Sequence, residues 1–146
     1  MTALVTIVAL ESAWAPPYPL TFFNAIAGGP GRGDAIVNDS NVDWGQGLVA
    51  LRRELDRRGI TKVHLAYHGT TDPALYGIDY SIYMGQSLGP ESDWLAVSSY
   101  FLVGLPARLT TMKGMSDQAV SYDMGPLRTR PPDARPGISM YLFRIR

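Results

Sequence analysis

The sequence predicts a single α/β domain, with a partly parallel or mixed sheet around a βαβ unit and helices packed on it. Three successive segments support this fold class. A short apolar segment occupies residues 35–37, and an amphipathic helix follows from Asp43 to about Arg58. A second predicted strand then occupies residues 62–67. Strand, helix and strand within roughly 35 residues are typical of a right-handed unit with parallel strands.

The central helix carries signals at both ends and on both faces. Asp43 can cap its N-terminus, with Gln46 three residues later as in a capping box. Gly59 supplies the left-handed residue that ends many helices. On the solvent side, Glu54 precedes Arg58 by one helical turn, which favours an ion pair. The buried face is predicted to consist of Leu48, Leu51 and Leu55.

The second half of the chain gives further elements. Asp72 before Pro73 predicts one helical turn, with proline at the first helical position after a capping residue. Residues 94–103 form a long apolar run, which fits either a central strand or a buried helix. Residues 104–136 show little periodicity. Residues 137–146 predict a closing strand whose two faces are both partly covered.

The composition limits the classes of function. The chain has 146 residues, 46% of them hydrophobic, which suits one globular domain with a core of its own. Its 13 basic and 13 acidic residues give a net charge of zero, which argues against nucleic acid as a partner. Cysteine is absent, which excludes disulfides, thiolate zinc sites and a cysteine nucleophile. We expect no cofactor.

Residues 1–15 form an apolar N-terminal segment that precedes the predicted domain of residues 16–146. Its apolar run of ten residues is shorter than the roughly 20 that cross a bilayer as a helix. Three interpretations stay open: a buried strand or helix start, the remainder of a membrane helix from a longer ancestor, or a surface that inserts into a partner. The candidate partner or membrane contacts are Leu4, Val5, Ile7, Val8, Trp14, Tyr18, Phe22 and Phe23.

The polar segment before the central helix is a weak metal candidate. Asp39, Asn41 and Asp43 have the alternating spacing of oxygen ligands in a calcium loop. The rest of that motif is missing, because Trp44 stands where the turn glycine is needed and Ala50 stands where the bidentate glutamate is needed. A polar turn that caps the helix is the simpler interpretation.

The same segment is also a candidate ligand site. Ligands gather at helix N-termini that follow strands of a parallel sheet. Two aspartates would repel an anion there, so a sugar hydroxyl or a cation fits better than a phosphate. The indole of Trp44 offers a surface on which a sugar ring could stack. The candidate ligand-binding residues are Asp39, Asn41, Asp43, Trp44 and Gln46.

Other polar groups give weaker signals. His64 and His68 alone make an incomplete zinc site, so a structural role is the simpler interpretation. The glycine-rich residues 29–33 lack the phosphate-loop pattern, and no serine stands in a nucleophile elbow. A basic stretch could contact an acidic partner or lipid headgroups, although a solvated loop is the default interpretation. It contains Arg128, Arg130 and Arg135.

Several motifs together resemble a known family. Residues 18–24 read YPLTFFN, and residues 27–30 read AGGP. Residues 39–46 read DSNVDWGQ, and residues 65–78 read LAYHGTTDPALYGI. With the closing segment 131–144, they resemble the soluble C-terminal region of bacterial membrane glycosyltransferases of the family 39-like, phospholipid-carrier-dependent type.

The resemblance implies a function without catalysis. In that family the catalytic carboxylates and the lipid-linked sugar site lie among membrane helices and extracytoplasmic loops that this sequence does not contain. His68 also replaces the family's phenylalanine. We therefore expect no catalytic residue and no enzyme activity, and a peripheral location on the extracytoplasmic (periplasmic) face of a membrane.

Two functions follow from this expectation. The first is an interaction or scaffold module, an accessory subunit docked on a membrane protein complex. That complex would be a glycosyltransferase or a bioenergetic assembly, such as a respiratory or photosynthetic one. The alternative is a domain that binds carbohydrate or a lipid-linked sugar and is associated with a glycosyltransferase.

Overall fold

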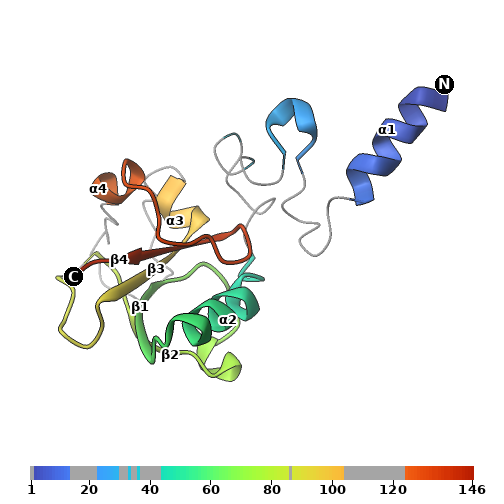
Figure 1. The fold of residues 1–146 in the computed structure, drawn as a ribbon. Helices are drawn as coiled ribbons and strands as arrows, with labels where there is room; N and C mark the ends of the chain where they lie inside the picture. The colour runs from blue at the N-terminus through green and yellow to red at the C-terminus, as the bar shows by residue number, and fades with distance from the viewer. Residues whose placement is uncertain are drawn as a thin grey trace, which may run out of the picture.

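A mixed sheet is the centre of the computed structural model (Figure 1). Its four strands are β1 (Lys62–Ala66), β2 (Asp79–Ile82), β3 (Trp94–Ser98) and β4 (Met140–Arg144), and their order is β2-β1-β3-β4. Strand β1 runs parallel to both β2 and β3, whereas β4 is antiparallel to β3. The predicted α/β fold with a partly parallel sheet is therefore confirmed. The structure describes residues 2–13, 23–29, 33, 36, 44–85, 87–103 and 124–146.

Helices accompany the sheet on both sides. Helix α2 (Leu48–Arg58) packs on one face, while α3 (Ser99–Val103) and α4 (Gly125–Arg128) lie toward the other (Figure 1). Two short 3₁₀ turns, η2 (Ala25–Ala27) and η4 (Pro73–Tyr76), lie in connecting segments. The sheet is thus sandwiched, and it has a hydrophobic core on each side.

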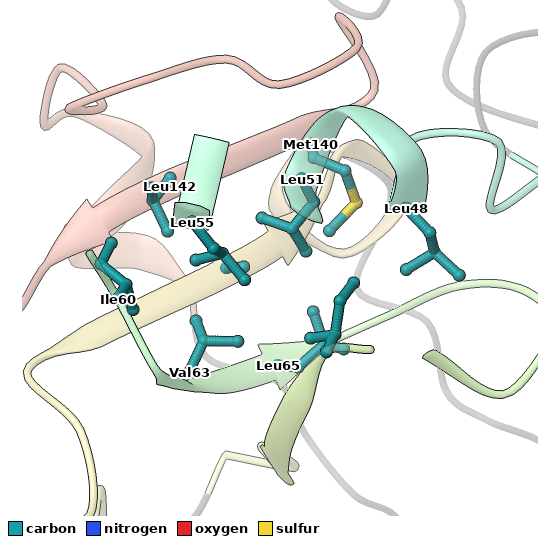
Figure 2. Close-up of a cluster of buried hydrophobic side chains, with 10 residues drawn as sticks. Leu48, Leu51, Leu55, Ile60, Val63, Leu65, Met140 and Leu142 are labelled. Atoms are coloured by element: carbon teal, nitrogen blue, oxygen red, sulfur yellow. The ribbon is translucent and has the colours of Figure 1, made fainter. Parts of the chain in front are cut away.

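The first core joins α2 to the sheet (Figure 2). The side chains of Leu48, Leu51 and Leu55 are at most 2% exposed, as their helical spacing predicts. They meet Val63 and Leu65 of β1, and further contacts come from β3 and β4. Burying a leucine side chain contributes about 1.5–3 kcal/mol, so this face of α2 is a main source of stability.

The second core lies on the opposite face of the sheet. Leu95, Val97 and Phe143 point to this side and pack with Leu102 of α3 and with Met124. Along β4, alternate residues therefore enter different cores, which confirms that both faces of the closing strand are covered. Residues 94–103 combine both predicted alternatives, because β3 ends at Ser98 and α3 begins at the next residue.

The start of α2 differs from the prediction. The helix begins at Leu48, and its N-cap is Gly47, which has no side chain that could cap it. The predicted N-cap, Asp43, therefore lies four residues before the observed one. The side chain of Gln46 lies in the turn before the helix, where its Oε1 accepts from the backbone N–H of Trp44 at 2.7 Å. At the other end, Gly59 has φ +66° and confirms the predicted left-handed terminus.

The prediction of a strand at residues 35–37, before α2, was wrong at Ile36, the residue of this segment that the structure describes. Ile36 lies in a turn, and its N–H donates to the carbonyl of Gly33 at 3.0 Å. Residues 35 and 37 lie outside the described part of the chain. The parallel pairs form after α2 instead, between β1 and the strands β2 and β3. A three-residue apolar run carries no periodicity that separates a strand from a turn.

The predicted turn at Asp72 is confirmed. Asp72 Oδ1 accepts from the N–H of Ala74 at 2.9 Å, and Pro73 takes the first position of η4. Gly77, with φ +72°, ends this turn in the left-handed region, which favours glycine. This connection brings the chain from β1 to the neighbouring parallel strand β2.

The outer edge of β4 is covered by the segment before it. Leu142 donates its N–H to the carbonyl of Ala134 at 2.9 Å, and its own carbonyl accepts from Asp133 N–H at 2.8 Å. The carboxylate of Asp133 also accepts from the N–H of Arg144 at 2.9 Å. Backbone groups that would otherwise face solvent along this edge are therefore paired.

Candidate functional site

Helix α1 (Thr2–Ala13) presents an exposed apolar surface. Successive residues of a helix are rotated by about 100°, so residues 5, 7, 8 and 10 point in different directions around its axis. Their side chains are all exposed: Val5 64%, Ile7 54%, Val8 54% and Leu10 68%. A helix that is apolar on all sides normally lies inside a protein core or a membrane.

Helix α1 stands apart from the sheet and its helices (Figure 1). The N-terminal run is thus a helix, but the interpretation that it is buried was wrong for these side chains. Of the helices that the structure describes, none combines the length and the hydropathy required to cross a bilayer.

The predicted contact residues have different surroundings. Leu4 belongs to α1, and Phe23 is half-buried with its ring against Gly33. The contact residues that the structure shows as exposed are Val5, Ile7 and Val8. Those outside the described residues are Trp14, Tyr18 and Phe22.

The predicted ligand segment is described only at its end. Trp44 is 61% exposed, and Gln46 is half-buried. Asp39, Asn41 and Asp43 lie outside the described residues, so the ligand site and the weak metal site at this segment stay predictions. Among the residues that the structure describes, no group of three or more histidine, aspartate or glutamate side chains could hold a metal ion.

Sequence reasoning missed a cavity at the carboxyl ends of β1 and β2. It has a volume of about 300 Å³. The loop after β1 forms one wall, with Thr70, Thr71 and Asp72, and the end of β2 forms another. Carboxyl ends of parallel strands are the usual place for ligand sites in open α/β sheets. The polar loop directly after a predicted strand was the signal that could have indicated it.

Tyrosines define the geometry of this cavity. Tyr80 donates its hydroxyl to Asp72 Oδ1 at 3.1 Å. Burial and then this carboxylate raise the pKa of the Tyr80 hydroxyl, so the phenol stays protonated at neutral pH. The hydroxyl of Tyr67 is packed so closely against Gly45 and Gly69 that a side chain at either position would overlap it. The turn before α2 therefore contacts the cavity wall.

A second cavity, of about 520 Å³, lies beside α3 and α4. The predicted basic stretch forms part of its wall, and its guanidinium groups are engaged within the domain. Each donates to a backbone carbonyl: Arg128 to Leu102, Arg130 to Arg144 and Arg135 to Ile138. The stretch is therefore tied to the fold and differs from a freely solvated loop.

The two histidines have separate partners, which supports structural roles. His64 is 3% exposed, and its Nε2 lies 3.2 Å from the carbonyl oxygen of Gly89. His68 follows the end of β1 and stacks on Tyr100, with 3.9 Å between the ring centroids.

Comparisons of the chain with protein-family models, with curated proteins and with solved structures give no match. The resemblance to the soluble region of membrane glycosyltransferases therefore stays a prediction from the motifs.

Proposed function

We propose that this protein is a non-catalytic interaction module that docks, through α1, on a membrane protein assembly at the extracytoplasmic face. The observation that supports the proposal is the exposure of apolar side chains on all sides of α1. A water-soluble partner that bound α1 in one complementary groove would cover only a single apolar stripe of the helix. An apolar phase, such as the bilayer beside a partner's membrane helices, accommodates the whole circumference.

The energetics favour such a transfer. Val5, Ile7, Val8 and Leu10 are each more than half exposed. Moving each of these side chains from water to an apolar environment contributes about 1 kcal/mol or more. The sequence of α1 contains one charged residue, Glu11, near its C-terminal end. Most of the helix can therefore lose water without burying a charge.

The remaining parts of the proposal have other supports. The non-catalytic role and the extracytoplasmic side depend on the resemblance, in which the reaction belongs to membrane helices outside this sequence. The choice of a protein assembly over nucleic acid depends on the zero net charge.

The test is a cross-linking experiment with the full chain in native membranes. A photoreactive residue replaces Val8, and the cross-linked membrane protein segments are identified by mass spectrometry. We expect adducts with membrane-spanning segments of one complex. A Val8→Gln/Leu10→Gln variant should lower the membrane affinity by about tenfold or more, since each change removes at least about 1 kcal/mol of apolar transfer.

The matched control changes two other exposed apolar residues elsewhere in the chain. Val49 is 44% exposed on α2, and Leu75 is 79% exposed on η4. A Val49→Gln/Leu75→Gln variant should bind membranes like the parent chain. Equal loss in both variants, or a monodisperse monomer that gives no adduct with a membrane complex, would contradict the proposal.

A further inference from the structure

The cavity at the ends of β1 and β2 has the size of a site for a small ligand. Its volume of about 300 Å³ lies at the lower limit of small-molecule sites. The loop after β1 and the end of β2 enclose it, and parallel pairing of Leu65 with Ile82 fixes these two segments against each other. The walls therefore belong to the rigid sheet and to the turn that Asp72 caps.

Three consecutive residues give this cavity a polar wall. Thr70 and Thr71 are exposed, and neither hydroxyl makes a hydrogen bond within the described part of the chain. Asp72 uses one oxygen, Oδ1, to accept from Ala74 and from Tyr80. Its Oδ2 accepts from none of the described residues. The wall thus offers two hydroxyls and one carboxylate oxygen to a ligand.

The rest of the lining is apolar or aromatic. Ile82 and Met84 are 54% and 47% exposed, and they line the cavity together with Tyr67 and Tyr80. Among the described residues that line the cavity, none is lysine or arginine. An anionic ligand would therefore meet the Asp72 carboxylate without a compensating cation.

We infer that this cavity binds a neutral polyhydroxy ligand of the size of one sugar ring. Vicinal hydroxyls can donate to the Asp72 carboxylate and exchange hydrogen bonds with Thr70 and Thr71, while the apolar face of the ring covers Ile82 and Tyr80. An organic cation would also suit tyrosines and a carboxylate, but it would make no use of the two threonine hydroxyls. The site is distinct from the one predicted at Asp39–Gln46, and it does not depend on membrane docking.

The test is an NMR titration of the full chain with methyl glycosides of glucose, galactose and mannose. We expect saturable shifts of the amides of residues 70–72 and 82–84 for at least one glycoside, with a dissociation constant of about 1–10 mM. Asp72→Asn should weaken binding about fivefold or more, because it removes a charged acceptor. Asparagine caps a helix as well as aspartate does, so the turn should keep its fold.

A matched variant separates the site from the general charge of the surface. Asp79→Asn removes an exposed carboxylate at the start of β2, outside the cavity, and should leave binding unchanged. Thr71→Val should weaken binding without a change of charge.

Three results would overturn the inference. One is the absence of saturable shifts up to about 100 mM glycoside. Another is equal glycoside affinity in the parent and Asp72→Asn chains. This includes the case in which only Trp44→Ala abolishes glycoside binding, because the glycoside would then bind at the segment predicted from the sequence. The third is tighter binding of tetramethylammonium than of every glycoside. The Val8→Gln/Leu10→Gln variant should bind glycosides normally, so failure of docking and failure of this site are distinguishable.

Discussion

Among the residues that the structure describes, Glu54 is the one whose charge is expected to matter most for the pH dependence of stability. Its carboxylate accepts from Arg57 Nη2 and Arg58 Nε, both at 2.5 Å. The hydrogen bonds from Arg57, and then those from Arg58, lower the pKa of Glu54 from 4.5 to about 2. Because the folded-state pKa is depressed, the stabilisation is complete above about pH 5 and is lost as the pH falls toward 2.

The magnitude follows from this difference in pKa. The full difference would correspond to about 3 kcal/mol. The Arg57 side chain is 64% exposed, so solvent and salt screen part of the interaction. We expect Glu54→Gln to lower the free energy of unfolding by about 1–2 kcal/mol at pH 7 and by close to zero near pH 2.

Urea unfolding of both chains between pH 2 and pH 7, followed by circular dichroism, measures this difference. The control is Asp93→Asn, since the exposed Asp93 carboxylate makes no ion pair among the described residues. If Glu54→Gln lowered the free energy of unfolding equally at pH 2 and pH 7, the reasoning would be refuted, because a loss of packing and not of charge would then explain the effect. Direct titration of the Glu54 carboxyl by NMR gives an independent value.

Four substitutions probe the core and the glycines by urea unfolding at pH 7. Leu51→Ala should cost about 2–5 kcal/mol, because Leu51 is fully buried, whereas Val49→Ala in the same helix should cost less than about 1 kcal/mol. Gly59→Ala should cost about 1 kcal/mol from the left-handed backbone alone, since apart from the adjoining residues no described atom lies within 4 Å of the added Cβ. Gly47→Ala should cost more, because its Cβ would lie 2.6 Å from Met140 Cγ. Equal losses for the two glycine variants would contradict this steric argument.

Local signals explain the elements that the sequence predicted well. The leucines of α2 repeat with the helical period, Gly59 ends the helix, and Asp72 before Pro73 begins η4. In each case the signal lies within a few residues along the chain. The alternation in β4 is of the same kind, because it needs only the two-residue period of a strand.

A competing local hydrogen bond and non-local pairing explain what the sequence did not predict. The start of α2 depends on a turn in which Gln46 bonds to Trp44, in competition with the capping box. The cavity depends on the parallel register that sets Leu65 beside Ile82. Neither the strand order nor this register follows from residue spacing. The exposure of α1 was equally out of reach, because an apolar run without periodicity does not say what surrounds it.

The covering of β4 restricts how this sheet can grow. Residues 133 and 134 use the backbone groups with which a further strand would pair on that side. Strand β2 occupies the opposite border of the sheet, and the side chain of Ile82 is more than half exposed there. A foreign or misfolded chain that extends the sheet would therefore add beside β2, so a proline or lysine there is the change that would protect the protein from aggregation.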